Sequence, residues 1–255
     1  FYRLQYPFDL EWIEGGMVDQ VQRLVHGKSM YVAPSINFVP FLYPPLYFYL
    51  SAVTSIMFGA GPFPLRLVSF SASLVSFALI FLIVRNETKK SWAALLSVGL
   101  FAATFRVTGA WLDVARVDSL FLALWLLFIY FVRGRESFLN SILAGIFAAS
   151  AFLTKQTALI LCLPVIVYLF WWNRKYALSI LLIAALVIEI TTMILEQASA
   201  GWYSYYVFEL LSQQTEWRPW MFASFWKDDL LVHLPLAFLF IIFFLLGKPK
   251  QNQPM

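Results

Sequence analysis

Seven apolar runs, each close to the length that crosses a bilayer, alternate with short polar breaks along this chain. They cover residues 64–84, 92–110, 118–132, 138–154, 156–172, 176–197 and 230–246. A spanning helix needs about 20 apolar residues, with a range of roughly 17–25. The chain is 61% hydrophobic and 13% charged, far from the composition of a soluble domain. The pattern predicts an all-α, polytopic membrane protein with about seven transmembrane helices.

Basic residues indicate which polar breaks share one side of the membrane. Half of the eighteen Lys and Arg residues lie in four breaks: Arg85, Lys89, Lys90, Arg133, Arg135, Arg174, Lys175, Lys248 and Lys250. Cytoplasmic loops of membrane proteins carry an excess of Lys and Arg. We therefore predict that these four breaks are cytoplasmic and that the loops between them lie on the outer face.

The predicted outer face begins with a long segment, residues 1–63. Apolar residues at helical spacing predict an amphipathic helix over 10–26 that lies on the membrane. The run 44–59 opens with two prolines, and we interpret it as a second interfacial helix, with an eighth span as the alternative. The transmembrane bundle then occupies 64–246, and 247–255 form a cytoplasmic tail.

Several functional classes find no support in the sequence. The net charge of +4 is small, is explained by the cytoplasmic breaks and accompanies no basic stripe, so nucleic acid is not a predicted partner. The single cysteine, Cys162, excludes a disulfide within the chain. His26 and His233 have no partners at metal-ligand spacing, so these residues predict no metal site.

Ionisable residues gather in the predicted outer loops. The candidates for chemistry are Asp9, Glu11, Glu14, Arg106, Arg116, Asp118 and Lys155. Asp118 and Lys155 each begin an apolar run, where a charge is costly unless it is paired or lines a polar cavity. Carboxylates from separate loops with cations nearby suit a site that deprotonates a hydroxyl and binds a phosphate. Taken singly, each acid is more typical of a solvated interfacial residue, and Lys155 is equally compatible with a side chain that reaches the headgroups.

Three segments carry a family resemblance. They are EGGMVDQVQRLVHGKSMY followed by FLYPPLYFYL, then GAWLDVARVDSLFLAL, then FLTKQTALIL. Together they resemble the GT-C glycosyltransferases, in particular the family-39-like enzymes that include the lipid-A aminoarabinose transferase and the protein O-mannosyltransferases. The resemblance covers roughly residues 6–172. It implies a GT-C-like helical bundle with outer-face amphipathic helices, and it implies that the chain is an N-terminal-half fragment, lacking the opening helix, that is inactive alone.

The resemblance also implies a function. A sugar would move, with inversion, from a polyprenyl-phosphate donor to an acceptor on the outer face of the inner (plasma) membrane. The sugar, the acceptor (lipid, glycan or protein) and the cofactor stay undetermined, and a divalent metal is left open. The alternatives are a transporter or flippase for lipid-linked sugars, for which Glu189 near the middle of a span is the candidate site, and a scaffold without catalysis.

Site residues follow from the matched motifs. Glu14 and Asp118 are the implied catalytic pair. Many relatives have Asp-Glu where this chain has Ile13-Glu14, so Asp9 or Glu11 would supply a further carboxylate.

The matched motifs also imply which residues bind the donor phosphate. Many relatives have a lysine where Tyr43 precedes the two prolines, so one phosphate contact is missing. In place of that lysine, we expect Lys155, Arg106 and Arg116 to bind the donor phosphate.

Overall fold

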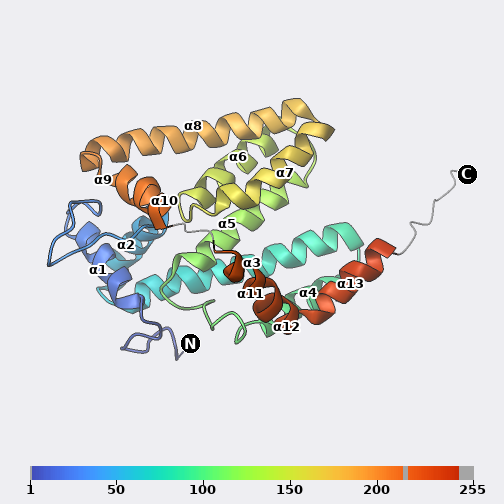
Figure 1. Ribbon diagram of the computed structural model, residues 1–255, viewed down its shortest axis with the longest axis horizontal. Helices are drawn as coiled ribbons and strands as arrows, with labels where there is room; N and C mark the ends of the chain where they lie inside the picture. Colours follow the sequence, from blue (N-terminus) through green and yellow to red (C-terminus); the bar gives the residue numbers. More distant parts are fainter. Residues whose placement is uncertain (1, 215–217, 247–255) are drawn as a thin grey trace, which may run out of the picture. The chain divides into compact units, whose positions relative to one another are not determined.

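The computed structural model describes residues 2–214 and 218–246, and the regular structure within these ranges is helical (Figure 1). The chain forms two compact units, Phe1–Ser212 and Gln213–Met255. The all-α fold class predicted from the apolar runs is therefore confirmed for the described residues. The predicted tail 247–255 lies outside them.

Two helices occupy the N-terminal segment, as predicted. Helix α1 spans Glu14–Val25 and α2 spans Leu46–Phe58. The prediction that α1 begins at residue 10 was wrong. The backbone N–H of Leu10 donates to the Glu14 carboxylate, and that of Ile13 donates to the Glu11 carboxylate. Side-chain acceptors therefore hold residues 10–13 in turns instead of a helix.

Six longer helices build the bundle of the first unit. They are α3 (Pro62–Thr88), α4 (Ser91–Ala103), α5 (Val117–Val132), α6 (Phe138–Phe152), α7 (Ala158–Trp172) and α8 (Arg174–Ser199). Helix α5 packs against α3 and α6, and α6 packs against α8 (Figure 1). Helix α4 lies against α3, and α7 lies against α8. The chain then turns into the short helices α9 (Trp202–Ser204) and α10 (Leu210–Gln214), with a π-helical turn over Tyr205–Glu209 between them.

Small residues allow these helices to approach closely. The buried face of α3 carries Ser69, Ala72, Ser73 and Ser76. On α6, a Cβ atom added to Gly145 would lie 2.7 Å from the Cβ of Ile183 and 2.9 Å from the carbonyl oxygen of Ile180. Interfaces of small residues are typical of helices that associate in lipid, because lipid supplies no hydrophobic drive for helix association.

The predicted helix 92–110 is shorter than expected. Helix α4 ends at Ala103, and residues 104–110 form turns. The Thr104 and Thr108 hydroxyls donate to carbonyls three or four residues earlier. Such bonds compete with helical ones, and the left-handed conformations at Gly109 and Ala110 prevent the helix from resuming.

The last predicted helix, 230–246, also differs in the structure. The second unit contains α11 (Pro219–Ser224), a π-helical turn over Phe225–Leu230, the single turn α12 (Leu231–His233) and α13 (Pro235–Leu246). Pro235 has no backbone N–H and disfavours a helical conformation at the residue before it. The chain therefore breaks at Leu234.

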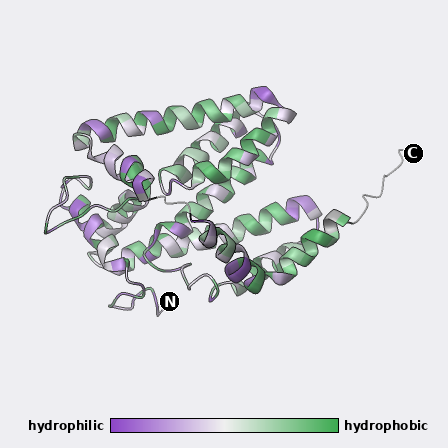
Figure 2. Cartoon of the chain, viewed as in Figure 1, coloured by the Kyte–Doolittle hydropathy of each residue, from purple (hydrophilic) through white to green (hydrophobic). Residues whose placement is uncertain are grey.

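The helices are apolar along most of their length. Within the described residues, α3 and α8 have the length and composition to cross a membrane, and α2, α4, α5, α6 and α7 are shorter apolar helices. Figure 2 shows hydrophobic residues along the middle of α8 and polar residues toward its ends. The number of membrane crossings stays a prediction.

The orientation of the bundle can be tested by labelling. After replacement of Cys162, cysteines at Asn86, Ser137 and Asn173 are expected to be shielded from an impermeant thiol reagent in intact cells, because they lie in basic polar breaks. A cysteine at the exposed Ser35 is expected to react. Labelling at Asn86 without labelling at Ser35 would reverse the predicted orientation.

Candidate functional site

The first two loops predicted to face outward, 1–63 and 111–117, meet at one end of the first unit. Arg3 forms an ion pair with Asp113, with 2.8 Å between the nitrogen and the oxygen, which ties the N-terminal loop to the loop before α5. Glu14 and Arg66 join α1 to α3. At the opposite end, the Arg133–Glu87 ion pair joins two of the basic breaks. The predicted grouping of loops therefore matches their contacts, whichever side of the membrane each end faces.

Four charged residues form a continuous chain of alternating sign at this first end. We call Glu11, Arg116, Asp118 and Lys155 the ionic network. The Arg116 guanidinium lies 3.1 Å from a Glu11 oxygen and 2.9 Å from Oδ2 of Asp118. Lys155 Nζ lies 2.6 Å from Oδ1 of Asp118. The network thus unites side chains from the first loop, the start of α5 and the turn between α6 and α7.

The ionic network remains within reach of solvent. Its side chains are between 11% exposed, for Arg116, and 26% exposed, for Lys155. Asp118, which is 22% exposed, accepts from both cations and lies in the first turn of α5, where the helix dipole favours a negative charge. A carboxylate in this position is paired with two cations and remains accessible.

Local contacts fix the cations of the network. The Arg116 guanidinium lies 4.0 Å from the centre of the Trp111 ring, a cation–π contact. The Ser69 hydroxyl donates to the Arg116 carbonyl at 3.1 Å, which holds this backbone to α3. Next to Lys155, the Gln156 side chain donates to the carbonyls of Leu42 and Val207. These bonds connect the turn to the segment before α2 and to the segment after α9.

Glu14, one of the predicted catalytic pair, lies in a different environment. Its side chain and that of Arg66 are completely buried and form a two-bond ion pair, with nitrogen–oxygen distances of 2.9 and 2.6 Å. The backbone N–H groups of Ala115 and Leu10 donate to the same carboxylate at 2.7 and 2.6 Å. Each Glu14 oxygen therefore accepts two hydrogen bonds.

Arg66 uses every donor that it has. Besides its two bonds to Glu14, it donates to the carbonyls of Arg3, Tyr6 and Phe8 at 3.0, 2.6 and 2.7 Å. A guanidinium has five N–H groups, so none is left unpaired. Burial alone would raise the pKa of Glu14, but the hydrogen bonds from Arg66, Ala115 and Leu10 outweigh it and hold that pKa below its usual value of 4.5. The Glu14 carboxylate is therefore held in place by four hydrogen bonds.

The remaining predicted residues lie outside the ionic network. Asp9 is exposed, and its carboxylate is 3.0 Å from where a Cβ of Gly15 would lie, over the start of α1. Arg106 is exposed in the turns after α4, and within the described residues its side chain makes no hydrogen bond or ion pair. The structure brings together Glu11, Arg116 and Asp118 with Lys155, but not these two residues.

Sequence reasoning did not single out Arg66 or Arg3. Arg66 lies near the start of the apolar run 64–84, where a charge is expensive and therefore marks a site of structure or function. That signal was available in the sequence. Arg3 offered none, because a single arginine in a polar loop is ordinary. Among the described residues, no group of three or more His, Cys, Asp or Glu side chains is arranged to hold a metal ion.

An apolar groove opens between α2, α3 and α5. Its volume is about 480 Å³, and its lining includes Leu50 and Val53 of α2, Val68 and Val75 of α3, and Leu120 and Leu127 of α5. Leu120 lies two residues after Asp118. Residues two apart lie about 200° apart around an α-helix, so the groove follows a different face of α5 from the one that carries Asp118. Its lining is suited to a hydrocarbon chain.

Comparison with known proteins relates this geometry to a family. The family model described as dolichyl-phosphate-mannose-protein mannosyltransferase matches residues 43–195, more than half of the chain. The crystal structure of ArnT from Cupriavidus metallidurans in the apo state is similar with a TM-score of 0.65 and 14% identity. The match covers 86% of this chain but 42% of ArnT, so the chain spans less than half of that protein's length.

A search of curated proteins finds no match. The likeness to ArnT confirms the GT-C-like bundle of a membrane protein at the level of the fold. The family match covers Asp118 and Lys155, whereas Glu11 and Glu14 precede it. Because the family model matches most of the described bundle, this chain belongs to the dolichyl-phosphate-mannose-protein mannosyltransferase family of GT-C membrane glycosyltransferases.

Proposed function

We propose that this chain is the donor-binding half of a membrane glycosyltransferase. The enzyme would move a sugar from a polyprenyl-phosphate donor to a hydroxyl acceptor on the outer face of the inner membrane, with inversion. The observation that carries the proposal is the ionic network, in which an accessible carboxylate lies between two cations. Family membership supports the reaction class.

The proposed reaction is a single displacement at the anomeric carbon. Asp118 would take the proton of the acceptor hydroxyl as the acceptor oxygen bonds to the anomeric carbon. The bond from that carbon to the phosphate oxygen breaks, and polyprenyl phosphate leaves with the electron pair. Glu11 would orient the acceptor from the other side of Arg116, which contacts both carboxylates.

The cations would stabilise the leaving phosphate. Lys155 and Arg116 contribute ammonium and guanidinium donors on either side of Asp118. Preorganised cations at a position where negative charge develops lower the barrier without reorganisation. The polyprenyl chain would lie in the groove between α2, α3 and α5, so the donor would be held at both its polar and its apolar parts.

Glu14 receives a supporting role in this proposal. Through Arg66 it fixes the N-terminal loop, and through the Ala115 N–H it fixes the residue that precedes Arg116. A shift of the loop before α5 would displace the network, and small displacements of catalytic groups reduce rates strongly. The base would therefore be Asp118, with Glu14 as a positioning residue.

Replacing Lys155 tests the donor site. In the full-length protein, Lys155→Ala is expected to raise the KM for a polyprenyl-phosphate sugar by about tenfold or more, because a charge-assisted phosphate contact is worth about 1.5–3 kcal/mol. Lys155→Arg is expected to recover part of this loss, since the two cations differ in shape. Initial rates over a range of donor concentrations measure both effects.

Lys90→Ala is the matched control, because Lys90 is an exposed lysine that follows α3 at the other end of the bundle. It is expected to leave the donor KM unchanged. An unchanged donor KM in Lys155→Ala as well would remove Lys155 from the phosphate site.

A further inference from the structure

A second groove lies at the opposite end of the bundle, between α5 and α7. Its volume is about 660 Å³. The side chains that form its apolar wall include Ile129, Val132, Val165 and Leu169, and Arg133 and Glu136 lie at its polar edge. The groove thus has an apolar wall and charged side chains at one end. Its lining shares no residue with the ionic network.

Residues of α7 form one side of the groove. Pro164, in the middle of α7, lines the groove and removes the backbone N–H that would bond to the carbonyl of Ile160. Two aromatic residues of α7, Tyr168 and Trp172, also line the groove and are 61% and 74% exposed. Aromatic residues in such positions are typical of the level of lipid headgroups.

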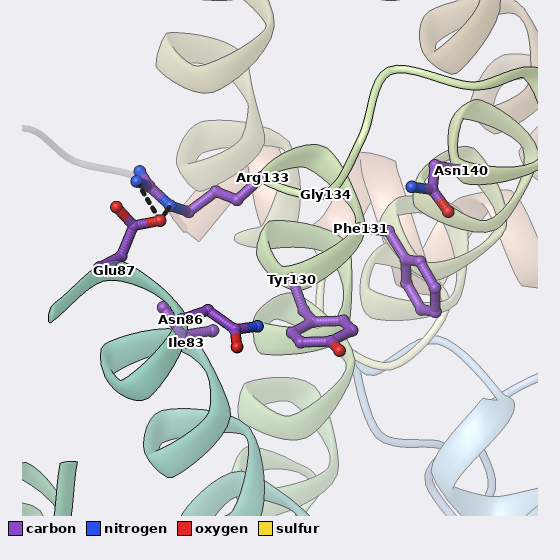
Figure 3. A pocket seen from close by; sticks show the side chains of 8 residues that line it. All are labelled: Ile83, Asn86, Glu87, Tyr130, Phe131, Arg133, Gly134 and Asn140. Carbon is purple, nitrogen blue, oxygen red and sulfur yellow. Dashed lines mark hydrogen bonds and ion pairs between the residues drawn. The ribbon is translucent and has the colours of Figure 1, made fainter. Parts of the chain in front are cut away.

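Cations outnumber acids at the mouth of the groove. Arg133 pairs with Glu87 at 2.6 Å, and both side chains are about half exposed (Figure 3). The Asn173 amide donates to Glu136 at 2.6 Å, which joins the two loops that border the mouth. Three further exposed cations lie nearby: Arg135 in the loop after α5, and Arg174 and Lys175 at the start of α8. The groove itself is lined by Arg133 and Glu136. With the three nearby cations, and with the Glu87 partner of Arg133 counted as well, four cations stand against two carboxylates, an excess of two positive charges.

We infer that this groove binds a phospholipid with an anionic headgroup. One acyl chain would lie along the wall formed by α5 and α7, and the phosphate would lie beside Arg133, between the loops that carry the excess positive charge. Basic pockets between membrane helices bind anionic headgroups in this way, and guanidinium groups suit phosphate geometry. The excess of cations favours this occupant over a neutral lipid or an apolar protein segment.

The test counts lipids that remain bound to the purified full-length protein. The protein is placed in bilayers with equal amounts of phosphatidylglycerol and phosphatidylcholine, extracted in mild detergent and analysed by native mass spectrometry. Retained phosphatidylglycerol is expected to exceed phosphatidylcholine. Arg133→Gln is expected to lower the retained phosphatidylglycerol about fivefold, the effect of one surface cation.

Two variants complete the design. Val165→Trp is expected to lower retention of both lipids, because the indole fills the groove while every charge stays in place. Lys90→Gln removes one positive charge at the same end but outside the groove, and is expected to retain as much phosphatidylglycerol as the parent protein.

Three results would overturn the inference. They are equal retention of the two lipids by the parent protein, equal losses in Arg133→Gln and Lys90→Gln, and unchanged retention in Val165→Trp. With Cys162 replaced, a cysteine at Val165 that forms a disulfide between two copies would show that a second copy, and not lipid, occupies the groove. None of these outcomes bears on the donor site.

Discussion

Arg66→Met is expected to lower the free energy of unfolding by about 3–5 kcal/mol, the cost of leaving one member of a buried ion pair without its partner. The substitution puts an unbranched apolar side chain in place of the guanidinium. The buried Glu14 carboxylate is then left without its cationic partner. It also removes the donors to three loop carbonyls. Thermal and denaturant unfolding of the purified full-length protein in detergent measure the loss.

Arg106→Met is the matched control, because Arg106 is exposed in a turn. Its effect is expected to stay within about 0.5 kcal/mol, as for most surface substitutions. Adding Glu14→Gln to Arg66→Met is expected to restore part of the lost stability, because the stranded charge is removed. Equal stabilities of Arg66→Met and Arg106→Met would contradict the structural role of the pair.

The same ion pair predicts a dependence on pH. The Glu14 carboxylate has a lower pKa in the folded state than its usual 4.5, so the folded state favours the ionised form. Its contribution to stability is therefore complete above pH 4.5 and is lost as the pH falls through the folded-state pKa. The difference in stability between the parent protein and Glu14→Gln is expected to shrink over that acid range.

Asp118→Asn is expected to lower kcat by about 10²–10⁴, the usual contribution of a positioned general base. The amide keeps the size and planar shape of the carboxylate but cannot accept the acceptor's proton. The fold is expected to persist, because Asp118 is partly exposed and Arg116 retains Glu11 as its partner. Single-turnover rates with saturating polyprenyl-phosphate sugar separate the chemical step from donor binding.

Asp113→Asn is the matched control for this prediction. Asp113 lies in the same loop and pairs with Arg3, away from the contacts of Asp118. It is expected to lower kcat far less than Asp118→Asn, because it weakens one contact of the loop but leaves the proposed base in place. Rates that fall equally in Asp113→Asn and Asp118→Asn would assign both residues to the support of the loop and leave the base unidentified.

Hydrophobic periodicity predicted most of the helices because a membrane helix is defined by a local property, the length of an apolar run. Helices α5 and α6 follow the predicted runs 118–132 and 138–154 within two residues. The errors occur where local hydrogen bonds override hydrophobicity. Thr104 and Thr108 end α4 early, and Pro235 divides the last run.

The candidate site was less predictable, because its residues acquire their roles from distant partners. The sequence grouped Asp118 with Lys155, and the structure pairs them. The family resemblance gave Glu14 the same rank as Asp118, because each lies in a matched motif. The difference between them depends on Arg66 and Ala115, which lie 52 and 101 positions from Glu14. No local pattern reveals that one carboxylate is saturated with donors and the other is accessible.

The hydrogen bonds of Arg66 restrict the amino-acid sequence of α3 more than that of the N-terminal loop. On α3 these bonds require arginine at position 66, because only a guanidinium supplies five donors in this geometry. In the N-terminal loop the acceptors are backbone carbonyls, which every amino acid provides. The side chains of Tyr6 and Phe8 are 46% and 70% exposed. This loop can therefore change its surface chemistry through substitution, and so contact different molecules, while its backbone path stays fixed from α3.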